Sequence, residues 1–267
     1  MSYNDLWIRD LGARYGVALL AILAIVFWMA SRWPKMRESW YRDYLIGFEV
    51  ECSDLAAFHK RRLFEPLHCL ISADETLRDV GRIRILEIGV KTGENIAFYP
   101  DDCHLVGVDL NKRLADHLFH DENAWRFRHI FVEQTIVGDG SRLGQTIPSG
   151  SVDAVVTTRT LCSVESPAAV LREIRRVLVQ GGTYFFMEHT PDPRQGTLIR
   201  WLQMFWSRSG IWPSLYGGCR PDFDPIPSIE MAGFEQVTWR RAALHGDTSR
   251  PHHLALTRHH IIGTAIR

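Results

Sequence analysis

A short buried strand that leads into a glycine-bearing turn, at residues 83–93, constrains the fold more than any other segment. Residues 83–88 are mostly β-branched or apolar and lie between glycines, which predicts a strand. Gly93 marks a point where a helix could begin, and a second strand, 105–108, ends at Asp109. Glycines let the backbone approach a ligand, amides at a helix start favour an anionic group, and a carboxylate at a strand tip can bind ribose hydroxyls. The segment therefore predicts a nucleoside-cofactor site, with an ordinary strand–turn–helix as the alternative.

Segments typical of strands and of helices alternate from residue 83 onward, which predicts a parallel sheet with helices on both faces. The clearest helix begins at Ser166, followed by Pro167, and is expected to stop at the glycine pair 181–182. Helices are also expected within residues 42–80. The predicted strands are residues 83–88, 105–108, 129–133, 152–157, 183–188, 234–240 and 260–265.

Several candidate site residues fall at or just past the carboxyl ends of these strands, where open α/β sheets bind ligands. Asp139 follows the third strand and could reach an adenine amino group, although a plain turn aspartate is an equal alternative. The other candidates at strand ends are Gly89, Asp109, residues 158–162, Glu188 and His189. We therefore expect the ligand site at this edge of the sheet.

The loop 87–93 resembles the acidic-x-G-x-G-x-G signature of S-adenosylmethionine-dependent methyltransferases and lacks the G-x-G-x-x-G pattern of dinucleotide-binding proteins. Further motifs occur in matching order and spacing at residues 86–100, 161–164, 176–182, 185–189, 218–219 and 260–265. Together with the apolar N-terminus they resemble the membrane-anchored methyltransferase-like proteins of the microsomal thiol S-methyltransferase family. The similarity spans that N-terminus and most of residues 83–267.

The resemblance implies an α/β fold of the Rossmann-like class I methyltransferase type with an N-terminal membrane-anchor helix. It also implies an enzyme that uses S-adenosyl-L-methionine to methylate small lipophilic acceptors, preferably alkyl thiols, at the membrane of the endoplasmic reticulum or at lipid droplets. Two alternatives stay open. One is a lipid or quinone methyltransferase, and the other is a catalytically weakened, membrane-docked protein that only binds the cofactor.

Lys91 stands where the family loop has glycine. Its ammonium could bind the cofactor's carboxylate, but it would repel the sulfonium if it leaned inward. Because related loops bind the cofactor without a lysine, restoring glycine is expected to improve binding. The resemblance implies these cofactor-binding residues: Glu87, Gly89, Val90, Lys91, Thr92, Gly93, Asp109, Leu110, Asp139 and Thr158.

Methyl transfer from a sulfonium requires the nucleophile, the methyl group and the leaving sulfur to be aligned. A thiol is a weak nucleophile until it is deprotonated, and histidine is a suitable base near neutral pH. We therefore predict His189 as the general base or a positioning group, with a structural hydrogen bond as the alternative. Glu188 is expected to orient His189 or to bind the cofactor's amine. Cys162 and Ser163 are expected to line the acceptor pocket.

An aromatic segment after the fifth predicted strand has helical spacing. It is either a helix packed on the sheet or a lid that presents an apolar wall to a lipophilic acceptor or to a membrane. On the second interpretation, Trp201 and Phe205 bind substrate. The spaced residues are Leu198, Trp201, Leu202, Phe205 and Trp206.

Residues 15–31 contain no formally charged side chain. A run of this length is at the lower limit for crossing a bilayer core, about 17–25 residues. A cleaved signal peptide is disfavoured because bulky Trp28 and Met29 spoil a cleavage site, and a buried core helix is the other alternative. The predicted domains are a membrane anchor (1–32), an amphipathic helical linker (33–80) and a methyltransferase domain (81–267). Basic residues after the anchor favour a catalytic domain that faces the cytosol.

The formal net charge is zero, with 31 basic and 31 acidic residues, so nothing suggests a nucleic-acid partner. The five cysteines have no zinc spacing, which favours a reduced compartment over a disulfide framework. Two adjacent histidine pairs, at 252–253 and 259–260, have no carboxylate or cysteine to complete a ligand set. The sequence therefore predicts no metal.

Overall fold

The computed structural model describes residues 3–119 and 124–267, and the chain separates into two units, residues 1–43 and 44–267. The first unit is almost entirely helix α1, which runs from Tyr3 to Tyr44. The helical run from Tyr15 contains a stretch that is long and apolar enough to cross a membrane, and none of that stretch is buried in the protein. The predicted boundaries at residues 32 and 80 stay predictions.

The second unit begins with the expected helices. A single π-helical turn, η1 (Leu45–Glu49), leads into α2 (Val50–Phe64), the 3₁₀ helix η2 (Glu65–Cys69) and the short helix α3 (Glu75–Asp79). Asp74 caps α3 because its side chain accepts hydrogen bonds from the amides of Thr76 and Leu77. The helical prediction for residues 42–80 is therefore confirmed.

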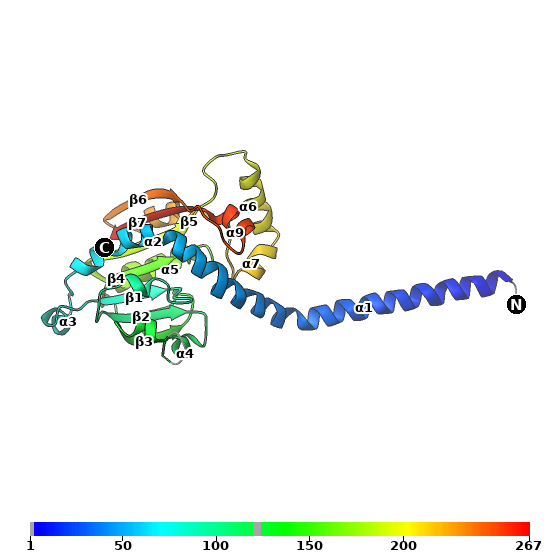
Figure 1. Ribbon diagram of the computed structural model, residues 1–267, viewed down its shortest axis with the longest axis horizontal. Helices are drawn as coiled ribbons and strands as arrows, with labels where there is room; N and C mark the ends of the chain where they lie inside the picture. Colours follow the sequence, from blue (N-terminus) through cyan, green and yellow to red (C-terminus); the bar gives the residue numbers. More distant parts are fainter. Residues whose placement is uncertain (1–2, 120–123) are drawn as a thin grey trace. The chain divides into compact units, whose positions relative to one another are not determined.

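Seven strands form one sheet in the order β3-β2-β1-β4-β5-β7-β6 (Figure 1). The first five strands are parallel, whereas β7 runs antiparallel to both β5 and β6. The α/β prediction is confirmed, but the sheet is mixed rather than parallel. The strands are β1 (Arg84–Ile88), β2 (His104–Asp109), β3 (Phe131–Val137), β4 (Val152–Thr158), β5 (Leu178–His189), β6 (Gln236–Ala243) and β7 (His259–Ile266).

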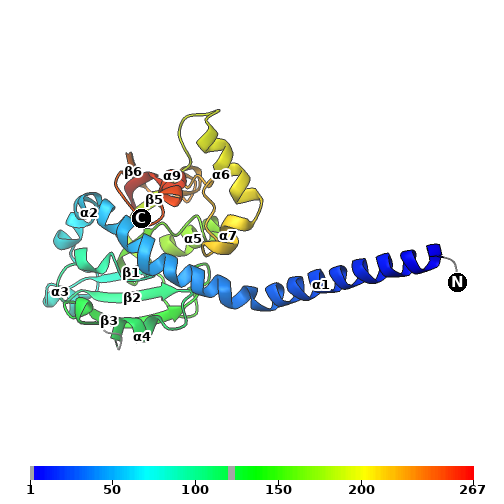
Figure 2. The ribbon, with the colours of Figure 1, turned by 45° about the vertical axis from the view of Figure 1, so that its right-hand side comes forward.

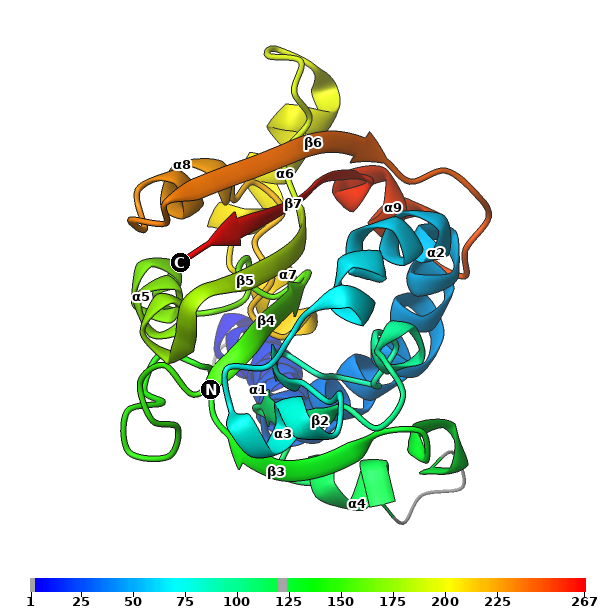
Figure 3. The ribbon, with the colours of Figure 1, turned by 90° about the vertical axis from the view of Figure 1, so that its left-hand side faces the viewer.

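Helices cover both faces of this sheet. Helix α5 (Pro167–Val177) lies on one face and α2 on the other (Figure 3). The apolar side of α5 packs into the core through four buried residues, and Ser166 caps its start as predicted. Burying four aliphatic side chains contributes about 1.5–3 kcal/mol each. They are Val170, Leu171, Ile174 and Val177.

The predicted end of α5 at Gly181 and Gly182 is wrong. The helix ends at Val177, and β5 starts at Leu178, whose extended backbone pairs with Val152. Gly181 adopts a φ of +75°, and a Cβ on Gly182 would lie 2.9 Å from the carbonyl oxygen of Val179. The glycine pair therefore allows an irregularity inside β5.

The helix expected from Gly93 is also absent. Only the 3₁₀ helix η3 (Ile96–Phe98) follows the turn. Gly93 has a φ of +76°, and a Cβ there would lie 2.8 Å from the ring of Phe127, so this glycine bends the chain instead of starting a helix.

The remaining helices complete the second unit. Helices α6 and α7 lie next to each other beyond the sheet, and α6 also packs against α9 (Figure 2). These elements are α4 (Leu114–Phe119), η4 (Ala124–Phe127), α6 (Leu198–Arg208), α7 (Ile211–Leu215), α8 (Ile226–Glu230) and α9 (Pro251–Thr257).

Candidate functional site

A cavity lies at the carboxyl ends of β1 and β4. One wall is the loop 89–92, and another is formed by Thr158, the last residue of β4, and Arg159. Residues of η1 and α2, including Glu49 and Lys60, close the opposite side. The loop that the sequence singled out, with Gly89, Val90, Lys91 and Thr92, therefore borders the cavity as expected.

The backbone of this loop is held in a conformation that favours glycine. Gly89 has a φ of +79°, and a Cβ there would lie 2.4 Å from Oγ1 of Thr160. Its amide donates to the carbonyl oxygen of Val108, 2.7 Å away. Val90 is buried beneath the loop. The conformation and the close approach of Thr160 both exclude a side chain at Gly89.

Asp109, at the end of β2, fixes the same loop. One carboxylate oxygen accepts the amide of Lys91 and the other accepts the amide of Asn111, each at 2.8 Å. Each oxygen can accept a second hydrogen bond, so the half-buried carboxylate can still bind a hydroxyl pair. The neighbouring Leu110 is 66% exposed and can cover a bound ring.

Glu87 lies behind the cavity wall. Its fully buried carboxylate accepts hydrogen bonds from Asn95 Nδ2 and from the hydroxyl of Tyr99, both at 2.7 Å. Burial raises the pKa of Glu87 to about 7, although both hydrogen bonds oppose the shift. Asn95 Nδ2 also donates to Oγ1 of Thr158. Glu87 therefore acts on the cavity through Asn95, a lining residue that sequence reasoning missed.

The Lys91 ammonium is bound inside the protein. It contacts Oε2 of Glu49 at 3.2 Å and the carbonyl oxygens of Arg159 and Thr158 at 3.1 and 3.4 Å. The other oxygen of Glu49 accepts from Nε of Arg159 at 3.1 Å and from the hydroxyl of Tyr44. Burial disfavours the charged form of Glu49 and acts to raise its pKa. The positive charges of Arg159 and Lys91 outweigh this effect and hold the pKa of Glu49 well below its usual range.

This ion-pair group joins residues that are far apart in the chain. Glu49 and Arg159 are 110 positions apart, and no spacing pattern connects them. The guanidinium of Arg159 also contacts Nε2 of His260, 3.2 Å away, and lies over the ring of Phe48. Glu49 was not predicted from the sequence, and Arg159 lay within the predicted segment 158–162 without a role of its own.

We expect Lys91→Gly to destabilise the protein and to bind the cofactor more tightly. The change breaks a buried ion pair but relieves a left-handed backbone at φ +53°, so the net loss in unfolding free energy should be about 2 kcal/mol. Binding should improve because one cavity wall recedes. Chemical unfolding measures the first effect and calorimetric titration with S-adenosylmethionine the second.

Lys91→Met is the matched control, because it removes the charge but keeps the strained backbone. It should be less stable than Lys91→Gly. Weaker cofactor binding in both variants would identify the ammonium as a cofactor ligand instead.

Glu188 lies at the end of β5, and three hydrogen bonds hold its carboxylate. Its carboxylate accepts hydrogen bonds from the hydroxyl of Thr157 at 2.7 Å and from the amides of Thr160 and Leu161 at 2.8 and 3.1 Å. Burial raises its pKa to about 8. Because neighbouring residues on a strand point to opposite faces, this carboxylate is directed away from His189 and holds the loop after β4.

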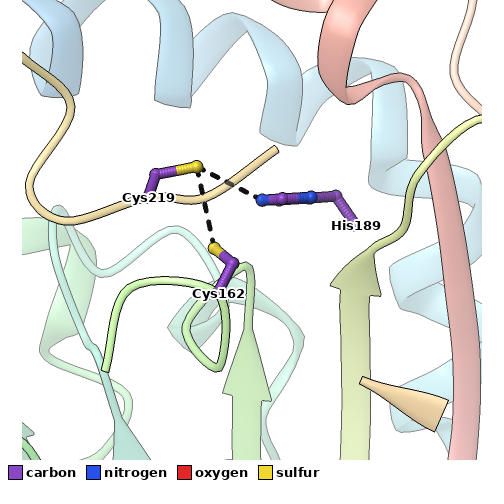
Figure 4. A group of neighbouring side chains, drawn as sticks. All are labelled: Cys162, His189 and Cys219. Carbon is purple, nitrogen blue, oxygen red and sulfur yellow. Dashed lines mark hydrogen bonds between the residues drawn. The ribbon is translucent and has the colours of Figure 1, made fainter. Parts of the chain in front are cut away.

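His189 and Cys162 lie close together, with Cys219 beside both. His189 Nε2 is 3.3 Å from the sulfur of Cys219, which in turn is 3.8 Å from the sulfur of Cys162 (Figure 4). The hydroxyl of Ser163 is 3.4 Å from the same Cys162 sulfur. Burial opposes ionisation of Cys162, but contacts with Cys219 and His189 outweigh it and hold its pKa well below the usual range.

Cys219 reaches this group because of the glycine before it. Gly218 has a φ of +86°, and a Cβ there would lie 2.8 Å from the carbonyl oxygen of Ser163. Glycine therefore lets the loop after α7 approach the loop after β4. The sequence offered Cys219 only as part of the 218–219 motif, with no assigned role.

The cavity lining includes five of the predicted site residues: Gly89, Val90, Lys91, Thr92 and Thr158. Asp139, Trp201 and Phe205 are among the predicted residues that it does not include. Oδ1 of Asp139 accepts both the amide and the hydroxyl of Ser141, as in a turn. Trp201 and Phe205 stack on each other on α6 and are 55% and 47% exposed. Helix α6 instead buries Gln203, so its aromatic stripe does not pack on the sheet.

Solved structures share this fold. An S-adenosylmethionine-dependent methyltransferase from Methanosarcina mazei superposes with a TM-score of 0.51 at 16% identity, covering 70% of this chain and 92% of the other. The [4+2]-cyclase SpnF gives 0.50 at 18% identity, covering 78% and 80%. The two names describe different reactions, so the likeness shows the fold alone.

Sequence comparisons are more specific. A family model described as a methyltransferase domain matches residues 86–186. Human thiol S-methyltransferase TMT1A is 32% identical over 224 residues, which cover 82% of this chain and 86% of the relative. Rat thiol S-methyltransferase TMT1B is 34% identical over 222 residues, covering 83% and 88%. The chain, with its Rossmann-like methyltransferase domain, therefore belongs to the family of the thiol S-methyltransferases.

Proposed function

We propose that this protein transfers the methyl group of S-adenosyl-L-methionine to small lipophilic thiols at a membrane surface. The observation that supports the proposal is that a cavity and a group of two cysteines and one histidine lie beside each other at one edge of the sheet. The cavity beside the loop 89–92 adjoins the group formed by Cys162, His189 and Cys219, since Lys91 Nζ and Cys162 Sγ contact the same carbonyl oxygen, that of Arg159. Relatives named as thiol S-methyltransferases agree with this assignment.

The residues around the cavity fit the proposed cofactor. Oδ1 of Asn95 is buried at the cavity without a hydrogen-bond partner among the described residues, and the cofactor's ammonium would satisfy it. Asp109 has acceptor capacity left for ribose hydroxyls, and Leu110 can cover the adenine. Bound there, S-adenosylmethionine supplies a methyl group activated by its sulfonium.

The protein's own part is to bind, align and desolvate the reactants. The loop 89–92 and Asp109 would fix the cofactor, and the buried surroundings of Cys162 would exclude water from the acceptor sulfur. We propose that His189 acts on the acceptor, either by positioning it or by accepting its proton. Glu188 would keep the loop after β4 in place beneath it.

An acceptor screen tests this function. Purified protein should methylate alkyl thiols in preference to lipids and quinones, with the products identified by mass spectrometry. Turnover of lipids or quinones alone would support the alternative that the protein is a lipid or quinone methyltransferase. Heat stabilisation by S-adenosylmethionine without turnover of any acceptor would indicate a protein that only binds the cofactor.

Removal of residues 1–32 tests the proposed anchor. We expect the truncated protein to shift in part to the soluble fraction, because the uncharged run 15–31 is lost. Its association with membranes should no longer resist carbonate. Some peripheral binding should remain through Trp33, Met36 and Trp40, which are all more than 40% exposed. Full-length protein that stays soluble after fractionation would contradict the anchor.

The membrane itself is proposed as that of the endoplasmic reticulum or the surface of lipid droplets, with the second unit in the cytosol. Fluorescence microscopy of the tagged full chain tests the location. Protease digestion of intact microsomes tests the side, since a cytosolic unit should be cleaved.

A further inference from the structure

Two thiols and an imidazole from three separate parts of the fold meet inside the protein. Cys162 follows β4, His189 ends β5, and Cys219 lies in the loop after α7 (Figure 4). Their ligand atoms, two sulfurs and one ring nitrogen, all lie within 4.8 Å of one another. The three side chains are 2%, 1% and 5% exposed, and both cysteines are free thiols.

Two of the three distances within the group are close to those around a tetrahedral zinc ion, and the third is no more than 4.8 Å. Zinc binds sulfur at about 2.3 Å and imidazole nitrogen at about 2.0–2.1 Å, which places two sulfurs about 3.8 Å apart and a sulfur and a nitrogen about 3.5 Å apart. The sulfurs of Cys162 and Cys219 are 3.8 Å apart, and Nε2 of His189 is 3.3 Å from Cys219. Small side-chain rotations would therefore suffice to surround an ion.

The donor set is also chemically suited to zinc. Two thiolates and a neutral imidazole form a soft to borderline set, and their charge balances a divalent cation. Within the described part of the chain the group supplies three ligands, which leaves the fourth tetrahedral position for an exogenous ligand.

We propose that Cys162, His189 and Cys219 bind one zinc ion, and that its fourth position takes the sulfur of the acceptor thiol. The second half of this proposal rests on the proposed thiol methylation. Zinc lowers the pKa of a coordinated thiol, so the acceptor would bind as a thiolate and release its proton to water. In this arrangement His189 positions the acceptor through the ion.

The methyl transfer then balances without any further reactant. An electron pair of the zinc-bound sulfur forms the new S–CH₃ bond. The bond between the methyl carbon and the cofactor's sulfonium breaks, and its electron pair stays on the sulfur of S-adenosylhomocysteine. The product is a neutral thioether, a weaker zinc ligand than a thiolate, so it can leave.

Metal content tests the site without any substrate. Full-length protein purified in detergent with reductant, freed of metal and then incubated with zinc sulfate, should hold one zinc per chain after gel filtration. Cys219→Ala should lower zinc affinity by more than about tenfold, since even changes that only support a ligand cost that much. Cys103→Ala is the matched control, because Cys103 is a buried free cysteine outside the group. It should bind zinc like the wild type.

Cobalt in place of zinc tests the fourth position. The wild type should show the visible bands of tetrahedral cobalt with thiolate ligands, and an alkyl thiol should shift them while its S-methylated product should not. This readout does not depend on whether Cys219→Ala folds. Wild-type protein that binds no zinc, zinc that Cys219→Ala retains in full, or a disulfide between Cys162 and Cys219 that persists in protein purified with reductant would each overturn the site.

The activity assay separates this proposal from the proposed function. Metal-free protein that methylates alkyl thiols at the full rate would overturn the zinc proposal and leave the function standing. Protein that holds zinc through the three residues and methylates no thiol would overturn the function and the acceptor role of the ion, and leave the metal site standing.

Discussion

Glu49→Gln should lower the free energy of unfolding by about 3–5 kcal/mol, the range for a buried ion pair that loses one partner. The carboxylate lies between the ammonium of Lys91 and the guanidinium of Arg159, and all three side chains are largely buried. A neutral amide would leave two cations facing each other in a medium that screens them poorly. Chemical unfolding of the detergent-solubilised chain, followed by tryptophan fluorescence, measures the loss.

Two further variants identify the cause of that loss. Lys91→Met combined with Glu49→Gln should recover about 1–2 kcal/mol, because the double variant buries one cation fewer. Glu51→Gln is the matched control. The Glu51 carboxylate accepts solvent-exposed hydrogen bonds from the amide and hydroxyl of Ser249, so this change should cost about 1 kcal/mol. Equal losses in Glu49→Gln and Glu51→Gln would contradict the ion-pair account.

The same carboxylate makes stability depend on pH in a defined direction. Its pKa is lower in the folded protein than in the unfolded chain, so its contribution is present above the ordinary carboxyl pKa. That contribution is lost as the pH falls through the lowered value. When the pH is lowered, the free energies of unfolding of the wild type and of Glu49→Gln should therefore converge. They should differ most near neutral pH.

Asp109→Ala should weaken the binding of S-adenosylmethionine by about 1.5–3 kcal/mol, which is about 10- to 150-fold in affinity. Two charge-assisted hydrogen bonds to the ribose would be lost. The loop would also lose the anchor of its Lys91 amide, so binding and loop order should fall together. Calorimetric titration of the wild type and the variant decides the matter.

Asp139→Ala is the control for this second prediction. Asp109 ends a parallel strand and Asp139 follows the next one in the chain, but the carboxylate of Asp139 binds Ser141 in its own turn. We expect its replacement to change cofactor affinity by less than about 1 kcal/mol. Unchanged affinity in Asp109→Ala would place the ribose elsewhere, and a large loss in Asp139→Ala would support contact with adenine.

The local pattern of apolar residues in the sequence predicted the strands whose side chains are buried on both faces of the sheet. β4 is buried along its whole length and was placed to within one residue. β3 was placed two residues early at its start and ends four residues later than predicted, because it lies at the edge of the sheet and Glu133 and Gln134 interrupt its apolar residues. The antiparallel direction of β7 could not be read from its composition, which resembles that of a parallel core strand.

The site residues also divide into those that the sequence could predict and those that it could not. The positions of Gly89 and Asp109 were predictable because each lies at or just past the end of a strand that the sequence pattern marks. Arg159 lay within a predicted segment, but its partner Glu49 comes from a helical turn 110 residues earlier. Cys219 and Cys162 are 57 residues apart and meet only because Gly218 lets two loops touch. Contacts of this kind depend on tertiary structure and leave no spacing signal.

The position of β7 in the sheet has a consequence for synthesis on the ribosome. β7 is translated after β6 and yet lies between β6 and β5, so β6 has no neighbour in the sheet until β7 has been made. The five parallel strands and their helices can assemble earlier. During translation the nascent chain therefore passes through a stage in which the edge of β5 is uncovered and β6 has no partner strand. A chaperone would protect the chain most at this stage.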